Sequence, residues 1–343
     1  MEMNIKKIWE SLGDELSKEI FTNRFLYLST GDAAFLQKTA LTTEYGRQMY
    51  SQMKKAERLV IFGAGEWGHS IKETYVDFDF LCFVDNDEKR TGSSRAGLPV
   101  ISFHEYLHSY KDALVVIASR IYNEEMERQL IENGISKDNI LNAGKMLDEL
   151  SIVQYFDFPT HQPGLDEAFV DAGCLDGKTS VLFTKWCENQ YTRIYAFEPD
   201  IRNHARCKKT FQDYGIENYE IIGKGLWNQA DSLCFTTNNN GTSSVAESGS
   251  ETIEVDSLDH MISENEKITF IKMDIEGSEL NALNGSRRTI GKDLPVLAVS
   301  VYHKPQDIIE IPDLVLRINE EYTLYLRHYS ICGNETVLYA IPR

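Results

Sequence analysis

Residues 169–200 read FVDAGCLDGKTSVLFTKWCENQYTRIYAFEPD and decide the fold of the second half of the chain. The apolar start of this stretch predicts a buried strand, which ends at the glycine-containing turn of residues 173–177. A helical pattern follows, and a second strand at 194–197 stops at Glu198, 25 residues after Gly173. The order of strand, glycine turn, helix and acid-tipped strand predicts a nucleotide-binding βαβ unit.

The turn reads DAGCLDG and not GxGxxG, and this difference indicates the kind of ligand. Glycines let the backbone approach a ligand, and an acid such as Glu198 can accept hydrogen bonds from both ribose hydroxyls. An acid before the first glycine, Asp171, suits a ligand with an amino group better than a pyrophosphate. These features favour S-adenosylmethionine (SAM), which is cationic, and we expect Asp171 and Gly173 to face its methionine part. The other cofactor-binding residues expected on the turn are Asp176, Gly177 and Thr179.

Length and composition limit the class of protein. The 343 residues suffice for about two domains, and the net charge of −18 argues against nucleic acid or anionic membrane as a partner. The six cysteines show no CxxC and no metal-ligand spacing, so reduced thiols and a cytoplasmic location are expected. The first residues lack the apolar core of a signal peptide, and no apolar run approaches the ~18 residues of a membrane helix.

The hydrophobic pattern divides the chain into three parts. Residues 1–55 form a helical segment, residues 56–148 alternate short strands with helices, and residues 149–343 repeat this alternation. We therefore expect an α/β protein with two Rossmann-like, doubly wound domains. In the second domain a turn at 332–334 joins the last two strands into an antiparallel hairpin. The seven strands expected there are 168–173, 193–198, 219–227, 268–274, 295–302, 322–329 and 336–342. This is the strand inventory of a SAM-dependent methyltransferase domain.

Two further stretches place acids and a histidine directly after strands. FIKMDIEGSELNAL (270–283) puts Asp274 and Glu276 at the carboxyl end of a central strand, where ligands bind in open α/β sheets. We expect both to be catalytic and Asp274 also to contact the cofactor. For Glu279, in the helix that follows, a functional and a purely structural role stay equally open. VLAVSVYHKPQDI (296–308) places His303 at the same edge, where it could act as general base on a hydroxyl. The Asp274–Glu276 pair is compatible with a divalent metal but does not require one.

Five motifs in order make the second half similar to a known family. DAGCLDGKTS, YAFEPD, IKMDIEGSE, SVYHKPQD and the terminal YLRHYS…ETVLYAIP resemble the FkbM family of SAM-dependent methyltransferases, over about residues 155–343. The resemblance implies a class I methyltransferase fold and O-methylation of a sugar or polyketide hydroxyl. It also implies cofactor contacts for Asp171, Gly173 and Glu198. The residues that match the acidic and histidine motifs of the family are Asp274, Glu276 and His303. Lys178 departs from the family, whose members often carry an acid there.

The first domain contains a second glycine loop, GAGEWG at residues 63–68, after a predicted strand. Asp85 ends the next strand, 22 residues after Gly63, a spacing that would by itself suggest NAD. The stretch FVDNDEKRTGSSRAGLPVIS resembles the small N-terminal domains of sugar-nucleotide-modifying enzymes. Three interpretations stay open for this loop: a structural turn, a site for a sugar nucleotide or another ligand, and an NAD site.

Together these features predict a SAM-dependent O-methyltransferase that acts on a hydroxyl of a sugar, glycan or related small metabolite. The expected partner is a small-molecule or glycan acceptor, without nucleic acid or membrane, and the sequence is compatible with a homo-oligomer. One alternative is a nicotinamide-dependent sugar-nucleotide oxidoreductase or epimerase that uses GAGEWG; another is a non-catalytic sugar-nucleotide-binding module. Acceptor recognition is expected in the first domain and in loops such as 228–250, whose polar stretch 238–244 has the composition of a mobile loop.

Overall fold

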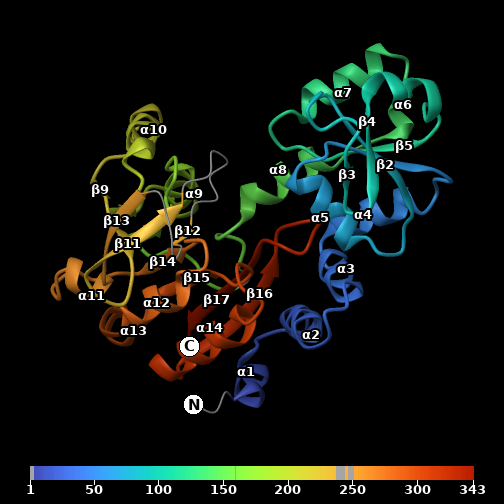
Figure 1. Ribbon diagram of the computed structural model, residues 1–343. Coiled ribbons are helices and arrows are strands. Elements are labelled where there is room, and N and C mark those ends of the chain that lie inside the picture. Colours follow the sequence, from blue (N-terminus) through green and yellow to red (C-terminus); the bar gives the residue numbers. More distant parts are fainter. Residues whose placement is uncertain (1–3, 159, 237–243, 246–250) are drawn as a thin grey trace. The chain divides into compact units, whose positions relative to one another are not determined.

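The computed structural model describes residues 4–158, 160–236, 244–245 and 251–343 (Figure 1). The chain divides into two compact units, and both are discontinuous in sequence. The C-terminal unit contains Met1–Lys18, Tyr155–Arg327 and Val337–Arg343, and the N-terminal unit contains Glu19–Gln154 and His328–Thr336. Among the described residues, no helix combines the length and hydrophobicity needed to span a membrane.

The two units differ from the expected ranges at both ends of the chain. Helix α1 (Ile5–Ser11) belongs to the C-terminal unit, where the segment after it pairs with strand β16: the amide of Gly13 donates to the carbonyl of Leu324 at 2.8 Å. The tip of the last hairpin belongs to the N-terminal unit, because Ile331 and Cys332 are fully buried in its apolar core. Contacts between residues far apart in sequence thus set the limits of the two units, and the local hydrophobic pattern of the sequence does not show such contacts.

The N-terminal unit is built on a six-stranded sheet in the order β3-β4-β2-β1-β5-β6. Its pairs are parallel except β3 with β4. The central strand β1 is buried on both faces: Leu59 and Ile61 join one apolar cluster, and Val60 and Phe62 join the other. The strands are β1 (Leu59–Phe62), β2 (Phe80–Asp85), β3 (Ser94–Arg95), β4 (Leu98–Ser102), β5 (Leu114–Ile117) and β6 (Ile140–Asn142). The other helices up to residue 153 are α2 (Glu15–Thr30), α3 (Ala34–Ala40), α4 (Glu44–Met53), α5 (Glu66–Thr74), α6 (Phe103–Ser109), α7 (Asn123–Glu132) and α8 (Ala143–Val153).

The C-terminal unit is built on a seven-stranded sheet in the order β16-β17-β15-β14-β7-β8-β9. The five strands from β15 to β9 are parallel, and β17 runs antiparallel to β15. The strands are β7 (Glu167–Ala172), β8 (Tyr191–Phe197), β9 (Tyr219–Ile222), β14 (Phe270–Met273), β15 (Val296–Ser300), β16 (Tyr322–His328) and β17 (Thr336–Pro342). The expected α/β class with parallel sheets is confirmed.

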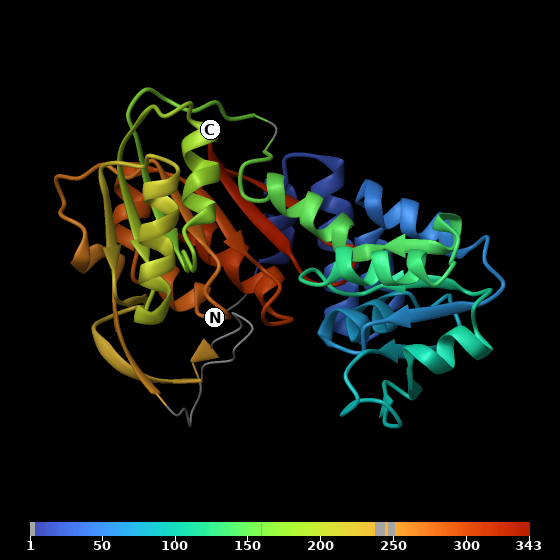
Figure 2. The same ribbon diagram turned by 90° about the horizontal axis from the view of Figure 1, so that it is seen from above.

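Helices cover both faces of this sheet (Figures 1 and 2). Helices α9 (Lys178–Trp186) and α10 (Ile201–Asp213) lie on one face, and α12 (Glu279–Asn284), α13 (Arg287–Asp293) and α14 (Asp307–Ile318) lie on the other (Figure 1). This division follows from right-handed crossovers, because the chain leaves β7 toward one sheet edge through β8 and later toward the other through β14 and β15. The carboxyl ends of β7, β14 and β15 therefore meet in the middle of one edge.

A small four-stranded sheet lies in the sequence between β9 and β14. It has the order β10-β13-β11-β12, with β10 (Gly225–Leu226), β11 (Asp231–Thr236), β12 (Ser244–Val245) and β13 (Glu251–Asp256), and helix α11 (Leu258–Met261) follows. Part of the expected loop 228–250 is therefore strand, because β11 pairs antiparallel with β13. Residues 238–243 of the polar stretch 238–244 lie outside the described residues.

Candidate active site

The glycine turn, residues 173–177, joins β7 to α9. Gly173 and Gly177 adopt the left-handed backbone conformation, with φ of 76° and 79°. A side chain at Gly173 would place its Cβ 2.1 Å from the carbonyl oxygen of Asp274, so only glycine fits there. The turn and the end of β14 are thus in direct contact. Both lie at the carboxyl edge of the sheet, where open α/β sheets bind ligands.

Asp171, the residue two positions before Gly173, lies beneath the turn. Its side chain is fully buried. One carboxylate oxygen accepts a hydrogen bond from Ser180 at 2.8 Å, and the other pairs with the ammonium of Lys272 at 3.2 Å. The carboxylate is thus engaged by two protein partners, and its expected contact with the methionine part of a cofactor stays a prediction. The strand register puts Asp171 of β7 opposite Lys272 of β14.

Glu198, at the end of β8, also holds the turn. Its carboxylate accepts hydrogen bonds from the amide of Leu175 at 3.0 Å and from the amide of Asp200 at 2.9 Å. Burial raises the pKa of this carboxyl, while those amide bonds lower it less. A carboxylate offers about four acceptor positions, so Glu198 keeps capacity for ribose hydroxyls while it fixes the turn.

The remaining residues of the turn and the start of α9 are placed as follows. Asp176 and Thr179 are half-buried, and Gly177 is buried against the ring of Phe211. The carboxylate of Asp176 pairs with the ammonium of Lys178 at 2.7 Å. Lys178, the residue that departs from the FkbM pattern, is exposed and thus neutralises an acid of the turn without entering the core.

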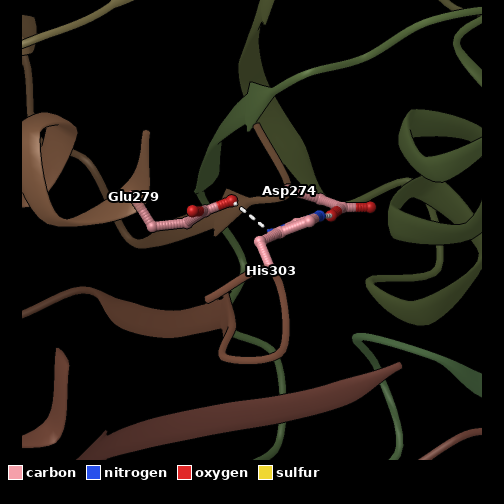
Figure 3. A group of neighbouring side chains, drawn as sticks. All are labelled: Asp274, Glu279 and His303. Carbon is pink, nitrogen blue, oxygen red and sulfur yellow. Dashed lines mark ion pairs between the residues drawn. The ribbon is translucent and has the colours of Figure 1, made fainter. Parts of the chain in front are cut away.

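Asp274, Glu279 and His303 form a compact cluster beside the turn (Figure 3). His303 lies between carboxylates: its Nδ1 is 3.0 Å from Glu279, and its Nε2 is 3.4 Å from Asp274 and 3.7 Å from Glu276. Glu279 is almost fully buried, whereas Glu276 is partly exposed. The structure thus brings together the three residues expected to be catalytic, and it adds Glu279 as the partner of the imidazole.

Electrostatics in the cluster favour charged forms. Burial alone would lower the pKa of His303, but Glu279, Asp274 and Glu276 together raise it to about 9. Burial would raise the pKa of Asp274, but Lys272 and His303 hold it below its usual value. The Asp274 carboxylate also accepts hydrogen bonds from Tyr155 at 2.8 Å and from Tyr302 at 3.3 Å. The cluster therefore contains an ionised acid with fixed orientation and a strongly basic imidazole.

The backbone that carries these acids is conformationally unusual. Glu276 has a φ of 55° and Gly277 a φ of 89°, so two successive residues are left-handed. Such a conformation costs about 1–3 kcal/mol at a non-glycine residue and is concentrated at functional sites. The ammonium of Lys304 donates to the carbonyl of Gly277 and ties this bend to the segment after β15. The bend sends the Glu276 side chain back toward His303.

The cluster also fits a divalent cation without requiring one. Asp274, Glu279 and His303 each offer one ligand atom, and these atoms lie within 4.8 Å of one another. One buried oxygen of Glu279 has no hydrogen-bond partner among the described residues. Two carboxylate oxygens and an imidazole nitrogen suit a divalent transition metal.

Sequence reasoning missed three residues of this site. Lys272 lies in the quoted motif IKMDIEGSE and is the lone charge in the apolar strand FIKM, but no role was assigned to it. Tyr155, from the segment before β7, and Tyr302, after β15, both donate to Asp274. Tyr302 lies in the quoted motif SVYHKPQD, next to His303, whereas Tyr155 stands in none of the five motifs.

The GAGEWG loop of the N-terminal unit has a different environment. Asp85, the acid that would bind the ribose of NAD, accepts a hydrogen bond from the amide of Ala64 at 2.8 Å and one from the amide of Asp87 at 2.9 Å. It also pairs with Arg90 at 3.2 Å. Asp85 thus accepts hydrogen bonds from backbone amides of its own loop, as Glu198 does from the amides of Leu175 and Asp200. Unlike Glu198, it is neutralised by an arginine, which reduces its ability to bind ribose.

Two family models match parts of the chain. Residues 171–328 match the family described as Methyltransferase FkbM domain, and residues 55–141 match the family described as C2185-like, N-terminal. Among curated proteins, none matches the chain. The crystal structure of methyltransferase FkbM from Methylobacillus flagellatus KT is 19% identical, with a TM-score of 0.55, and the similarity covers 95% of this chain and 99% of that chain. At this identity the similarity shows the fold alone.

Two other solved structures are less similar. A rRNA methylase from Streptococcus thermophilus is 17% identical over 58% of this chain and 95% of that chain, with a TM-score of 0.34. Fibrillarin from Aeropyrum pernix, solved with bound S-adenosyl-L-methionine, is 11% identical over 59% of this chain and 81% of that chain, with a TM-score of 0.37. TM-scores this low add nothing to the assignment.

The matched family range contains the glycine turn, Glu198, Asp274 and His303, which are the residues that the fold brings to one sheet edge. Residues 171–328 therefore match an FkbM methyltransferase domain, and the protein is a SAM-dependent methyltransferase.

Proposed function

We propose that this methyltransferase transfers the methyl group of SAM to a hydroxyl of a sugar, glycan or related small metabolite. The observation that carries this proposal is the buried His303 next to Asp274, whose carbonyl touches Gly173 of the turn. A base that can take a hydroxyl proton thus lies beside the segment expected to bind the cofactor. The negative charge of Asp274 and Glu276 suits a cationic cofactor and a neutral acceptor.

We propose that the C-terminal part, 149–343, is a class I methyltransferase domain of the FkbM type. Its parallel sheet with a terminal antiparallel hairpin supports this assignment. Residues 56–148 would then form a Rossmann-like domain that contributes to acceptor binding. The cysteines are unpaired among the described residues, which supports a cytoplasmic location.

In this proposal the turn and Glu198 bind the cofactor. Glu198, which also accepts from Asn203, takes the ribose through its remaining acceptor capacity. Asp176 and Gly177 of the turn and Thr179 at the start of α9 enclose the rest. Gly173 allows the backbone to approach the ligand, since it has no side chain. Asp274 then lies where the cationic end of SAM arrives.

We assign the general base to His303 and its orientation to Glu279. The chemistry that bound SAM supplies is an activated methyl group for in-line displacement by the acceptor oxygen. His303 Nε2 accepts the hydroxyl proton, and Glu279 holds Nδ1 and stabilises the imidazolium that results. A base whose pKa is near 9 is a strong acceptor but is mostly protonated at neutral pH. A cationic cofactor next to the ring lowers that pKa and releases the base form.

A ligand panel separates the proposed activity from its alternatives. We expect SAM and S-adenosylhomocysteine to raise the melting temperature of the protein, because a ligand that binds only the folded state stabilises it. NAD and nucleotide sugars form the comparison arms. Stabilisation by NAD without any by SAM would contradict the proposal and favour a nicotinamide-dependent oxidoreductase.

Glu198→Ala should abolish detectable binding of S-adenosylhomocysteine in calorimetry, because it removes the ribose acceptor and a support of the turn. Glu220→Ala is the control, since Glu220 is an exposed acid on the neighbouring strand β9. An unchanged affinity in Glu198→Ala would remove the ribose assignment.

His303→Gln should lower turnover by about 10²–10⁴-fold, the usual contribution of a positioned base, and should leave cofactor affinity unchanged. In the wild-type enzyme kcat/KM for SAM should rise with pH up to about 9, because it reports the pKa of His303 in the free enzyme. The measurement is methyl transfer from labelled SAM between pH 6 and 10. Full activity of His303→Gln would exclude it as the base.

His303 should also make stability depend on pH. Its pKa is about 9 when folded and about 6.5 when unfolded, so its stabilising effect is complete below about pH 6.5 and is lost between about pH 6.5 and 9. The difference in unfolding free energy between wild type and His303→Gln should therefore shrink over this interval, by roughly 3 kcal/mol. Urea titrations at several pH values measure it. A difference that stays constant with pH would show that His303 is not paired as described.

A further inference from the structure

Lys272 is a buried lysine in the middle of the C-terminal unit. It lies in β14, where the other residues are apolar, and its side chain is 2% exposed. Burying an ammonium costs several kcal/mol unless hydrogen bonds and an opposite charge compensate. Its place in the fold therefore requires an explanation.

All three N–H groups of the Lys272 ammonium are used by one short segment. They donate to the carboxylate of Asp171 at 3.2 Å, to the carbonyl of Ala172 at 3.1 Å and to the carbonyl of Gly173 at 2.8 Å. An ammonium has three N–H donors and no acceptor. Lys272 is thus saturated by the end of β7 and the first glycine of the turn, and it has no donor left for a ligand.

These bonds hold the turn at its most constrained point. Gly173 is left-handed and packs against the carbonyl of Asp274. The amides of Gly173 and Cys174 both donate to the carbonyl of Phe197, at 3.0 and 3.1 Å. The turn is therefore held on its carbonyl side by Lys272 and on its amide side by β8.

Two further contacts connect this lysine to the rest of the site. The second oxygen of Asp171 accepts from Ser180, which ties the ion pair to helix α9. The ring of Tyr155 lies 5.4 Å from the ammonium, and its hydroxyl donates to Asp274. The buried ammonium of Lys272 thus contacts both the turn and Tyr155, which donates to Asp274.

We propose that Lys272 is a positioning residue for the cofactor, which fixes the carbonyl groups of Ala172 and Gly173 and with them the turn that receives SAM. The inference rests on the proposed binding of SAM at this turn. A simpler role as counterion of Asp171 makes a different prediction, because it requires only that the two buried charges cancel.

The double variant Asp171→Asn/Lys272→Met distinguishes the two roles. Lys272→Met alone leaves Asp171 buried and unpaired, so we expect it to lower the melting temperature. The double variant removes both charges, so stability should recover relative to the single variant. The carbonyl of Gly173 still lacks its Lys272 donor, and that of Ala172 keeps only the amide of Asp274 at 3.2 Å. The affinity for S-adenosylhomocysteine should therefore stay at least about tenfold weaker than in wild type.

The kinetic signature is a raised KM for SAM with kcat changed much less, because the lysine supports binding and does not touch the reacting atoms. The matched control is Asp14→Asn/Arg327→Met, which removes a partly buried ion pair of the same unit, 2.6 Å long, between the segment after α1 and strand β16. It should change stability without changing the affinity for S-adenosylhomocysteine.

Calorimetry with S-adenosylhomocysteine on the folded variants measures their affinities relative to wild type. Weak binding by Asp171→Asn/Lys272→Met with normal binding by the control supports the proposal. Wild-type affinity in the double variant would overturn it and leave Lys272 as a counterion. If wild-type protein itself binds no S-adenosylhomocysteine, the proposed cofactor site fails, and the role of Lys272 fails with it.

Discussion

The site depends on the close approach of Gly173 to the backbone of Asp274. This contact leaves no room for a side chain on the turn, and it places the end of β7 directly beside the end of β14. The parallel register of these two strands makes the contact possible, and the same register sets Lys272 opposite Asp171. The buried ion pair, the glycine turn and the acidic cluster are therefore consequences of one strand pairing.

The cluster around His303 places an imidazole and three carboxylates at this edge of the sheet. Three carboxylates surround one imidazole, and two of them, Asp274 and Glu279, are held by further hydrogen bonds from Tyr155 and from the amide of Ile275. Because these acids cannot easily move away, the ring keeps both its orientation and its raised pKa. In the proposed mechanism, a bound cationic cofactor would lower the pKa of this imidazole.

The sequence predicted the location of the site better than the direction of its side chains. Asp274, Glu276 and His303 were predictable because each follows a strand, and parallel strands end at one edge. The roles of Asp171 and Lys272 were not predictable, because strand register decides whether a side chain points at a ligand or at a neighbouring strand. The pattern also revealed the alternation of strands and helices in both halves. It did not reveal that the tip of the last hairpin packs into the N-terminal unit, since two buried residues, Ile331 and Cys332, carry no local signal.

In the proposed function, SAM binds between the glycine turn and Glu198, with its methyl group toward His303. A crystal structure of the protein with S-adenosylhomocysteine tests this binding mode most directly. We expect ribose hydroxyls within hydrogen-bond distance of the Glu198 carboxylate and the sulfur atom on the side of the turn that faces Asp274 and His303. Ligand density at the GAGEWG loop, or at the turn but with the sulfur directed away from His303, would contradict it.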